Sequence, residues 1–254
     1  MRRIKITLSV LLLIIVCCNA RAQEKRVLVF FKTMKYYHES IPAAIAAIEK
    51  LGTEHRFYVD TTTDGRKFND ENLQKYTTVI FLSTTGTTLD TVQRIAFRRY
   101  IEAGGGYMGI HAASTSDKDW TWYGNLVGAV FKNHPTPQEG YVIVTDKNNP
   151  ATRGLPARWK RMDEWYNFIK IPTDVHVLLC ADETTYQGGT NGTYHPLAWY
   201  HEYDGGRSFY TALGHFADSY SDPLYLGHIW GGLQYAMGSG EKLDYSKVPT
   251  PPAQ

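Results

Sequence analysis

Four short predicted strands alternate with helical segments, and this pattern constrains the fold of this chain more than any other feature. The strands are RVLVFF, HRFYVDTT, TVIFLS and YMGIH, at residues 26–31, 55–62, 78–83 and 107–111. Continuous apolar runs of this length are typical of strands buried on both faces of a parallel sheet. Between them, helices are predicted at residues 41–51 and 91–103, and Asp90 stands where it would cap the second. This alternation predicts a doubly wound, mostly parallel α/β sheet.

The second half of the chain favours antiparallel pairing. GYVIVTD and VHVLLCAD, at residues 140–146 and 175–182, are predicted strands with no long helix between them. Residues 196–213 contain DGG between two apolar runs, which indicates a β-hairpin. A last helix is predicted from Asp222-Pro223 to Met237. We therefore predict one α/β domain over residues 23–240 with an antiparallel hairpin extension, followed by a Pro-rich tail at 241–254.

The N-terminal sequence predicts export. MRRIK is a basic start, an apolar run follows, and Ala20 and Ala22 have the small-x-small spacing of a signal peptidase site. We expect residues 1–22 to be a signal peptide, and the mature chain to be periplasmic or secreted. The apolar run is short for a stable membrane span. A lipoprotein anchored at Cys17 or Cys18 is the minor alternative.

The composition excludes several function classes. The chain is 43% hydrophobic and 20% charged, as in globular proteins. Its 27 basic and 25 acidic residues give +2, but the first 22 residues hold four basic and no acidic residues, so the remainder is at −2. No basic stripe is left to indicate a nucleic-acid partner. Cys180 is the only cysteine after residue 22, so no intrachain disulfide is expected.

Three of the nine histidines follow predicted strands and are the strongest candidates for a site. His38 follows the first strand, His111 ends the fourth, and His215 follows the hairpin. Ligands of open α/β sheets bind at the carboxyl ends of parallel strands, so these side chains are expected near one crevice. His134 and the pair Asp163–Glu164 are further candidates. We expect a structural role for four others, namely His55, His176, His201 and His228.

Two kinds of chemistry remain open for this set. Neutral imidazoles with a carboxylate are common ligands of zinc and similar divalent metals. The same groups could instead work without metal as general acid and base. The chain has no HExxH motif, serine elbow or phosphate-binding loop, and GGGYMG precedes a strand instead of joining a strand to a helix. No nucleotide cofactor is therefore expected.

Several motifs in their order resemble the ThuA-like family, named for trehalose utilisation. They are VLVFFKTMKYYHES, GGGYMGIHAAS, WYGNLVGAVFKNHP, MDEWYNF, HPLAWYHEYDGGRSFYTALGH and IWGGLQYAMG, and they cover residues 26–238. The resemblance implies a fold of the flavodoxin and class I glutamine amidotransferase type. In those amidotransferases a G-x-C-x-G turn presents the nucleophilic cysteine, and here Gly109–Ala113 matches it with His111 in the cysteine's place. An imidazole cannot form the required thioester, so we expect no amidotransferase activity.

The resemblance implies a role in disaccharide or 3-keto-glycoside metabolism and carries five residues over as the site. They are His38, His111, His134, Glu164 and His215. Asn149 stands where the family usually has a histidine, so that position is not included.

Our hypothesis is an exported enzyme that acts on a carbohydrate by hydrolysis, elimination or isomerisation. His111, His134 and Glu164 are the predicted catalytic residues. The predicted ligands of a divalent metal such as zinc are His38, His111, Glu164 and His215. Tyr123, Trp165 and Tyr166 are predicted to contact the sugar, since aromatic rings with polar tips suit carbohydrate clefts. The alternative is a non-catalytic carbohydrate-binding or accessory protein. Substrate, metal identity and oligomeric state stay open.

Overall fold

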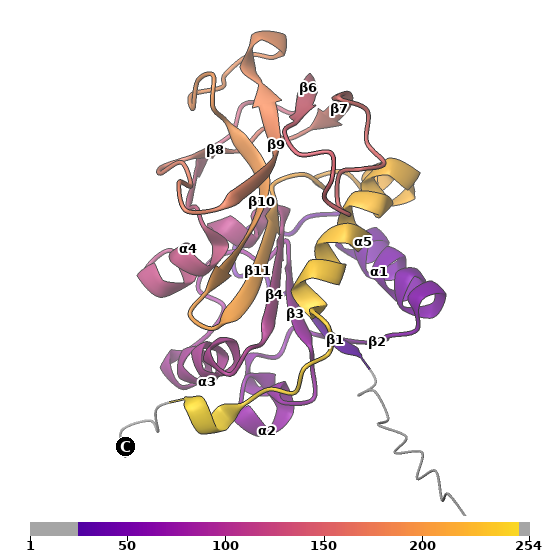
Figure 1. Cartoon of the computed structure of the whole chain (residues 1–254). Coiled ribbons are helices and arrows are strands. Elements are labelled where there is room, and N and C mark those ends of the chain that lie inside the picture. Colours follow the sequence, from indigo (N-terminus) through magenta and orange to yellow (C-terminus); the bar gives the residue numbers. More distant parts are fainter. Residues whose placement is uncertain (1–24, 249–254) are drawn as a thin grey trace, which may run out of the picture.

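A single mixed sheet of nine strands organises the protein, seen here in a computed structural model that describes residues 25–248. The strand order is β2-β1-β3-β4-β11-β10-β9-β6-β7 (Figure 1). Five neighbouring strands run parallel: β2 (Tyr58–Thr62), β1 (Arg26–Phe30), β3 (Thr78–Leu82), β4 (Gly106–Ile110) and β11 (Gly206–Thr211). The predicted α/β fold is confirmed.

The antiparallel extension is larger than the predicted hairpin. It comprises β10 (Pro196–Tyr203), β9 (His176–Asp182), β6 (Gln138–Val144) and β7 (Arg158–Asp163). A separate small sheet pairs β5 (Phe131–Asn133) with β8 (Asn167–Phe168). Strand β10 lies alongside β11, and β9, β6 and β7 lie toward the top of Figure 1.

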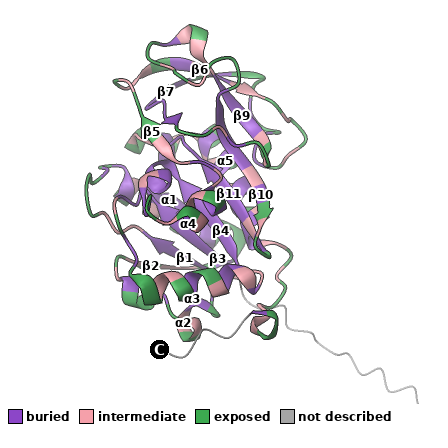
Figure 2. Cartoon of the chain, turned by 90° about the vertical axis from the view of Figure 1, so that its left-hand side faces the viewer, coloured by how far each residue is buried: buried purple, intermediate pink, exposed green. Residues whose placement is uncertain are grey.

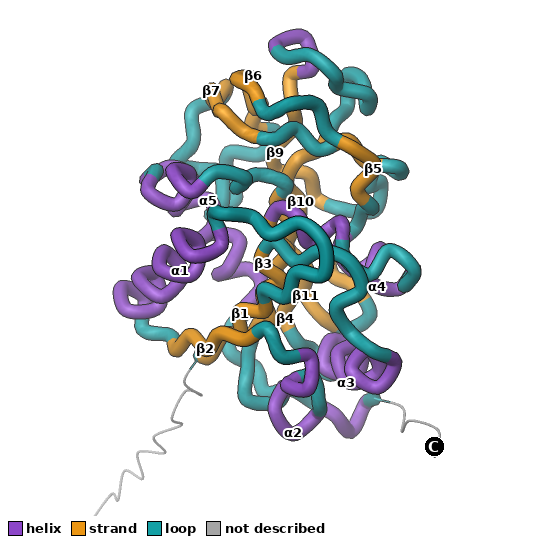
Figure 3. The backbone as a smooth tube through the Cα atoms, turned by 180° about the vertical axis from the view of Figure 1, so that it is seen from behind, coloured by secondary structure: helices purple, strands orange, loops and turns teal. Residues whose placement is uncertain are grey.

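Helices cover both faces of the parallel half. The helices α1 (Ile41–His55) and α5 (Pro223–Met237) lie on one side, and α3 (Thr91–Glu102) and α4 (Thr121–Val127) on the other (Figures 1 and 3). The short α2 (Asp70–Leu73) packs against α3. With both faces covered, β3 and β4 are buried at every position, as Figure 2 shows. This explains why their sequences are apolar throughout instead of alternating.

The ends of the helices follow local sequence signals. Asp90 accepts a hydrogen bond from the backbone N–H of Gln93 and donates its own backbone N–H to the Gln93 side-chain oxygen, so a complete capping box starts α3. Asp222 caps α5 ahead of Pro223. The largest boundary difference from the prediction is at the end of α1, which continues to His55 and is followed by the C-cap Arg56 with a left-handed φ of 60°. The second strand therefore begins at Tyr58 instead of residue 55.

Two predicted segments fall wholly or partly outside the described residues. The predicted signal peptide, residues 1–22, is one of them. Of the tail, residues 241–248 are described, and Asp244 donates its backbone N–H to the carbonyl of Ala103. Among the described residues no helix is long and apolar enough to cross a membrane. Cys180 is a buried free thiol whose pKa is raised by burial to about 11.

The parallel topology brings three loops together at one edge of the sheet. Isolated parallel bridges join Thr33 to Thr85 and Gly86 to Ser116, so the chain segments after β1, β3 and β4 lie side by side. The segment after β11 reaches the same edge, because β11 pairs in parallel with β4. Side chains from these four segments can therefore face one another.

Candidate functional site

His111 occupies a sharp turn directly after β4. Its φ of 52° lies in the left-handed region, which is uncommon for a residue with a side chain, and it starts a 3₁₀ turn, His111–Thr115. Its carbonyl accepts a hydrogen bond from the Tyr210 hydroxyl at 2.8 Å. The strand before it passes close to other rings, since a Cβ on Gly109 would lie 2.6 Å from the Tyr107 hydroxyl oxygen. The backbone thus has the form of a nucleophile elbow but presents an imidazole.

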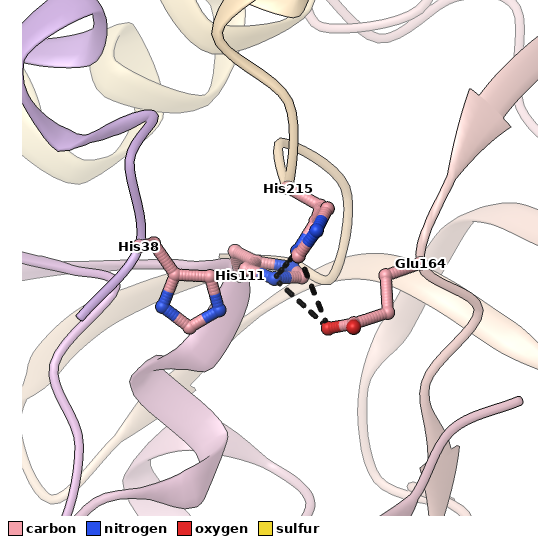
Figure 4. A group of neighbouring side chains, drawn as sticks. All are labelled: His38, His111, Glu164 and His215. Carbon is pink, nitrogen blue, oxygen red and sulfur yellow. Dashed lines mark hydrogen bonds and ion pairs between the residues drawn. The ribbon is translucent and has the colours of Figure 1, made fainter. Parts of the chain in front are cut away.

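Four side chains from different parts of the chain converge at this turn. His38 comes from the loop between β1 and α1, His215 follows β11, and Glu164 follows β7. One potential ligand atom from each of these residues and from His111 lies within 4.8 Å of the others. Figure 4 shows the three imidazoles and the carboxylate pointing toward one another. We call this group the His–Glu cluster.

The orientation of His111 is fixed by its other ring nitrogen. Nδ1 lies 2.7 Å from the carbonyl oxygen of Ala212 and donates to it, so the lone pair is on Nε2. That Nε2 lies 3.4 Å from Glu164 Oε2 and 3.3 Å from His215 Nδ1. His215 Nδ1 is itself 3.4 Å from Glu164 Oε2. A backbone partner behind the imidazole is the usual arrangement of a metal-ligating histidine.

Asp163 joins two of these side chains through the backbone. It is fully buried, and its Oδ1 accepts from the N–H of Glu164 at 3.0 Å and of His215 at 3.1 Å. Oδ2 accepts from Gly214 N–H at 3.1 Å and lies 3.6 Å from Arg161. The carboxylate therefore ties the end of β7 to the segment after β11 and positions Glu164 and His215 together.

The charges of the cluster follow from burial and mutual contacts. Burial, with His111 and His215 nearby, lowers the pKa of His38 to about 3. Burial by itself would raise the pKa of Glu164, but the neighbouring imidazoles of His111 and His215 outweigh it and lower that pKa below its usual range. Burial disfavours the charged form of His215, but the nearby Glu164 carboxylate favours it more strongly, so the pKa of His215 is raised. Glu164 is thus ionised and His38 neutral near pH 7.

The donor set suits a divalent metal. Three imidazoles and one carboxylate are ligands of zinc and comparable ions. Nδ1 of His38 is buried and, within the described residues, has no hydrogen-bond partner, which is costly for a polar atom. The His–Glu cluster therefore fits a metal ion, with His38, His111, Glu164 and His215 as its ligands.

A cavity of about 590 Å³ opens above the cluster. His38, Glu164 and His215 line it, whereas His111 is fully buried beneath them and is not part of the wall. His134 lines the cavity too, with Nδ1 3.1 Å from Glu164 Oε1, and its side chain is 37% exposed. The cavity is large enough for a small sugar.

Of the three aromatic residues predicted to contact a sugar, one lines the cavity and two lie in the core. Tyr166 lines the cavity, and its hydroxyl lies 3.2 Å from His111 Nε2. Tyr123 is in the core, where its hydroxyl bonds Tyr107 and the carbonyl of Ala113. Trp165 is fully buried and donates to the carbonyl of Gln138. Neither of these two is among the residues of the cavity wall.

Sequence analysis missed several residues of the cavity wall, namely Lys35, Tyr36, Thr85, Lys118 and Phe131. Lys35 and Tyr36 lie in the same loop as His38, so the position after the first strand indicates all three residues. The four histidines expected to be structural lie outside the cluster. Among them, His201 and His228 are buried with ring nitrogens bonded to backbone carbonyls, and His55 stacks on Trp230.

The sequence matches the family model ThuA, described as trehalose utilisation, over residues 26–236. The chain belongs to the ThuA family. Among solved structures, it resembles a ThuA-like protein from Bacteroides uniformis at 26% identity and a TM-score of 0.75, covering 89% of this chain and 96% of that one. A search among curated proteins finds no significant match.

More distant similarities concern the fold alone. A ThuA-like protein from Parabacteroides merdae matches at 20% identity and a TM-score of 0.68, over 84% of this chain and 90% of that one. A β-galactosidase from Bacillus circulans sp. alkalophilus matches at 12% identity and a TM-score of 0.53, over 87% of this chain and 31% of that one. The fold of this chain thus resembles part of a larger protein, and fold similarity does not transfer activity.

Proposed function

We propose that this ThuA-family protein is an enzyme that acts on a disaccharide or 3-keto-glycoside by hydrolysis, elimination or isomerisation. The proposal rests on one observation above all, the His–Glu cluster at the floor of a cavity of about 590 Å³. Membership of the trehalose utilisation family supports a carbohydrate as the substrate. The three imidazoles and Glu164 would hold a divalent metal.

The residues of the site divide the chemistry between them. A bound divalent cation would supply Lewis-acid polarisation of a substrate oxygen. A keto group acidifies the neighbouring C–H, so one base is then sufficient to remove that proton. His134 is placed for this role, because it lines the cavity and its Nδ1 lies 3.1 Å from Glu164 Oε1. Glu164 would orient the imidazole and stabilise its protonated form.

Glutamine hydrolysis finds no support at this site. The elbow residue His111 has no thiol, and the free Cys180 lies in β9 with its pKa raised to about 11 by burial. A thioester intermediate requires a reactive thiolate, which a buried thiol of raised pKa does not supply.

The proposal is tested by removing His111 from the cluster. We expect purified wild-type protein to contain about one equivalent of metal and His111→Ala to contain none, with loss of turnover on a panel of glycosides and 3-keto-glycosides. A chelator should abolish wild-type turnover. Because φ at this position is 52°, His111→Asn is a second variant, since Asn tolerates the left-handed region better than Ala.

His176→Ala is the matched control, because it removes an exposed histidine that stacks on Tyr200 outside the cluster. It should keep wild-type metal content and turnover. Unchanged metal and activity in both His111 variants would refute the assignment. Saturable sugar binding without turnover, unaffected by chelator, would favour the non-catalytic alternative.

We also propose that the protein is exported, on the strength of its N-terminal sequence. Cell fractionation and N-terminal sequencing should find a mature chain beginning at Gln23 outside the cytoplasm. A chain that begins at Met1 in the cytoplasmic fraction would contradict export, and a lipid-modified Cys17 or Cys18 would identify a lipoprotein instead.

A further inference from the structure

Two lysines stand on the wall of the cavity above the His–Glu cluster. Lys35 and Lys118 line the same cavity as His38, Glu164 and His215. Glu164 is the only acidic residue among the lining residues, and it already contacts His111, His134 and His215. The wall therefore carries two positive charges that no carboxylate of the cavity is free to neutralise.

The backbone beside each lysine is held in place by buried polar contacts. Thr85 Oγ1 accepts from Lys35 N–H at 3.2 Å and donates to the carbonyl of Tyr36 at 3.0 Å, which fixes the chain on both sides of Lys35. Asp117, next to Lys118, is buried, and its carboxylate accepts from the Thr88 hydroxyl at 2.6 Å and from Arg94 at 2.8 Å. The two lysines thus extend from fixed points of the fold.

Neither ammonium group has an ion-pair partner or has all of its hydrogen-bond donors occupied within the described part of the protein. Among the described residues, no carboxylate lies within ion-pair distance of Lys35 or Lys118, although several surface lysines elsewhere have such a partner. Lys118 Nζ donates one hydrogen bond, to the carbonyl of Phe131 at 2.7 Å, and lies 4.8 Å from the centre of the Phe131 ring. An ammonium has three donors, so two remain for a ligand.

We propose that the substrate carries an anionic group, a carboxylate or a phosphate, which Lys35 and Lys118 bind while the sugar oxygens face the His–Glu cluster. This inference rests on the proposed function of the cavity and narrows its substrate class to acidic sugars. Charge-assisted hydrogen bonds from two ammonium groups would both select the ligand and orient it. Like-charged side chains kept close together at a ligand cavity otherwise bring only repulsion.

Binding of matched sugars measures this selectivity. Calorimetric titration of the purified protein would use glucuronate, glucose 6-phosphate and neutral glucose, before and after removal of metal by a chelator. We expect at least one anionic sugar to bind at least tenfold more tightly than glucose. In Lys35→Met/Lys118→Met, which keeps the apolar stems, that preference should fall to within about twofold. The stronger of the two anions identifies carboxylate or phosphate as the group recognised.

The matched control is Lys132→Met. It removes the same charge one residue from Phe131, on a side chain that contacts Thr190 and does not line the cavity, and it should keep the wild-type preference. Equal affinity for glucose and both anions, no measurable binding of either anion, or a preference that survives in the double variant would each overturn the proposal. Survival in the double variant together with loss on chelation would assign the anion to the metal instead.

Failure of this inference is distinguishable from failure of the proposed function. Metal content and turnover are measured on the same samples, and the lysine variants leave the four ligands of the His–Glu cluster intact. A protein that holds metal and turns over neutral glycosides would retain the proposed function while excluding acidic selectivity.

Discussion

Two buried histidines, His228 in α5 and His38 at the cavity, have similar burial and different surroundings. Burial lowers the pKa of both, to about 4 for His228 and about 3 for His38. The ring of His228 has a partner at each nitrogen, the carbonyl of Ala151 at 3.0 Å and the hydroxyl of Thr211 at 3.1 Å. Nδ1 of His38 has none among the described residues. His228 therefore completes a hydrogen-bond network within the protein. His38 keeps a ring nitrogen that no group in the described part of the chain contacts through a hydrogen bond and that is free to bind a ligand.

His195 extends the comparison to the region behind the site. It is fully buried, with Nδ1 2.7 Å from Glu183 Oε1 and Nε2 2.7 Å from the carbonyl oxygen of Tyr166. Both nitrogens face acceptors, so this imidazole is held as a structural group. His195 and His228 are thus held by protein partners at both ring nitrogens, whereas Nδ1 of His38 has no partner among the described residues.

The largest expected difference is in the free energy of unfolding. His228→Ala should lower it by about 3 kcal/mol, because it leaves a cavity and two buried groups without partners. His38→Ala should cost less than about 1 kcal/mol in metal-free protein, because the loss of packing is offset by removal of an unpaired polar atom. Urea denaturation of the metal-free variants measures both values.

The same denaturation experiment, repeated with zinc present, compares how strongly the metal stabilises wild type and the two variants. At a hundredfold excess over its dissociation constant, zinc should stabilise wild type and His228→Ala by about 2.7 kcal/mol and leave His38→Ala far less affected. An equal loss of stability in the two metal-free variants, or equal stabilisation by zinc, would remove the distinction between the two histidines.

The pH dependence of stability sharpens the same comparison. The unfolded chain protonates these histidines near pH 6.5, whereas the folded chain does so only near 4 for His228 and 3 for His38. Between pH 6.5 and 4.5 the unfolded state therefore binds more protons, and stability falls as the pH falls. His215 adds little slope in the lower part of this window, because its pKa is raised in the folded state and well below pH 6.5 both states are protonated.

Each of the two histidines contributes up to about 1.4 kcal/mol per pH unit to this slope in metal-free protein. His38→Ala should lower the slope between pH 6 and 5 by about 1 kcal/mol per unit, as measured by urea denaturation at several pH values. His176→Ala, the exposed control, should leave it unchanged. An identical slope in wild type and His38→Ala would show that His38 takes up its proton while folded.

The parts of the fold that the sequence predicts are those where burial and local signals agree. The apolar strands β1, β3 and β4 and the capped starts of α3 and α5 follow directly from residue patterns. Strand β7 was not predicted, because its sequence RWKRMD contains three basic residues. One of its inward positions is Arg161, which is buried by contacts with Asp222 and Ser219, and such pairing depends on tertiary structure.

The residues of the site also differ in how far sequence patterns alone predict them. His38, His111 and His215 could be assigned to one edge of the sheet, because parallel strands end there. Glu164 comes from the antiparallel extension, so its approach to within 3.4 Å of His111 depends on a chain path that periodicity does not encode. Tyr123 and Trp165 show the opposite difficulty, since an aromatic side chain fits a core and a sugar cleft equally well.

The smallest expected effect concerns the hydroxyl of Tyr166. Burial raises the pKa of Tyr166 well above its usual range, so the hydroxyl stays protonated and donates to His111 Nε2 across 3.2 Å. That lone pair is the one a metal would need, so the hydroxyl competes with the metal. Tyr166→Phe should tighten zinc binding up to about fivefold, the equivalent of one hydrogen bond of about 1 kcal/mol. Competition with a chromophoric chelator measures the change.

The matched control is Tyr186→Phe, which removes the hydroxyl 3.1 Å from His195 Nδ1 and should leave zinc affinity unchanged. Weaker zinc binding by Tyr166→Phe would instead mean that the hydroxyl helps to hold the ion, and it would contradict the expected competition for the His111 lone pair.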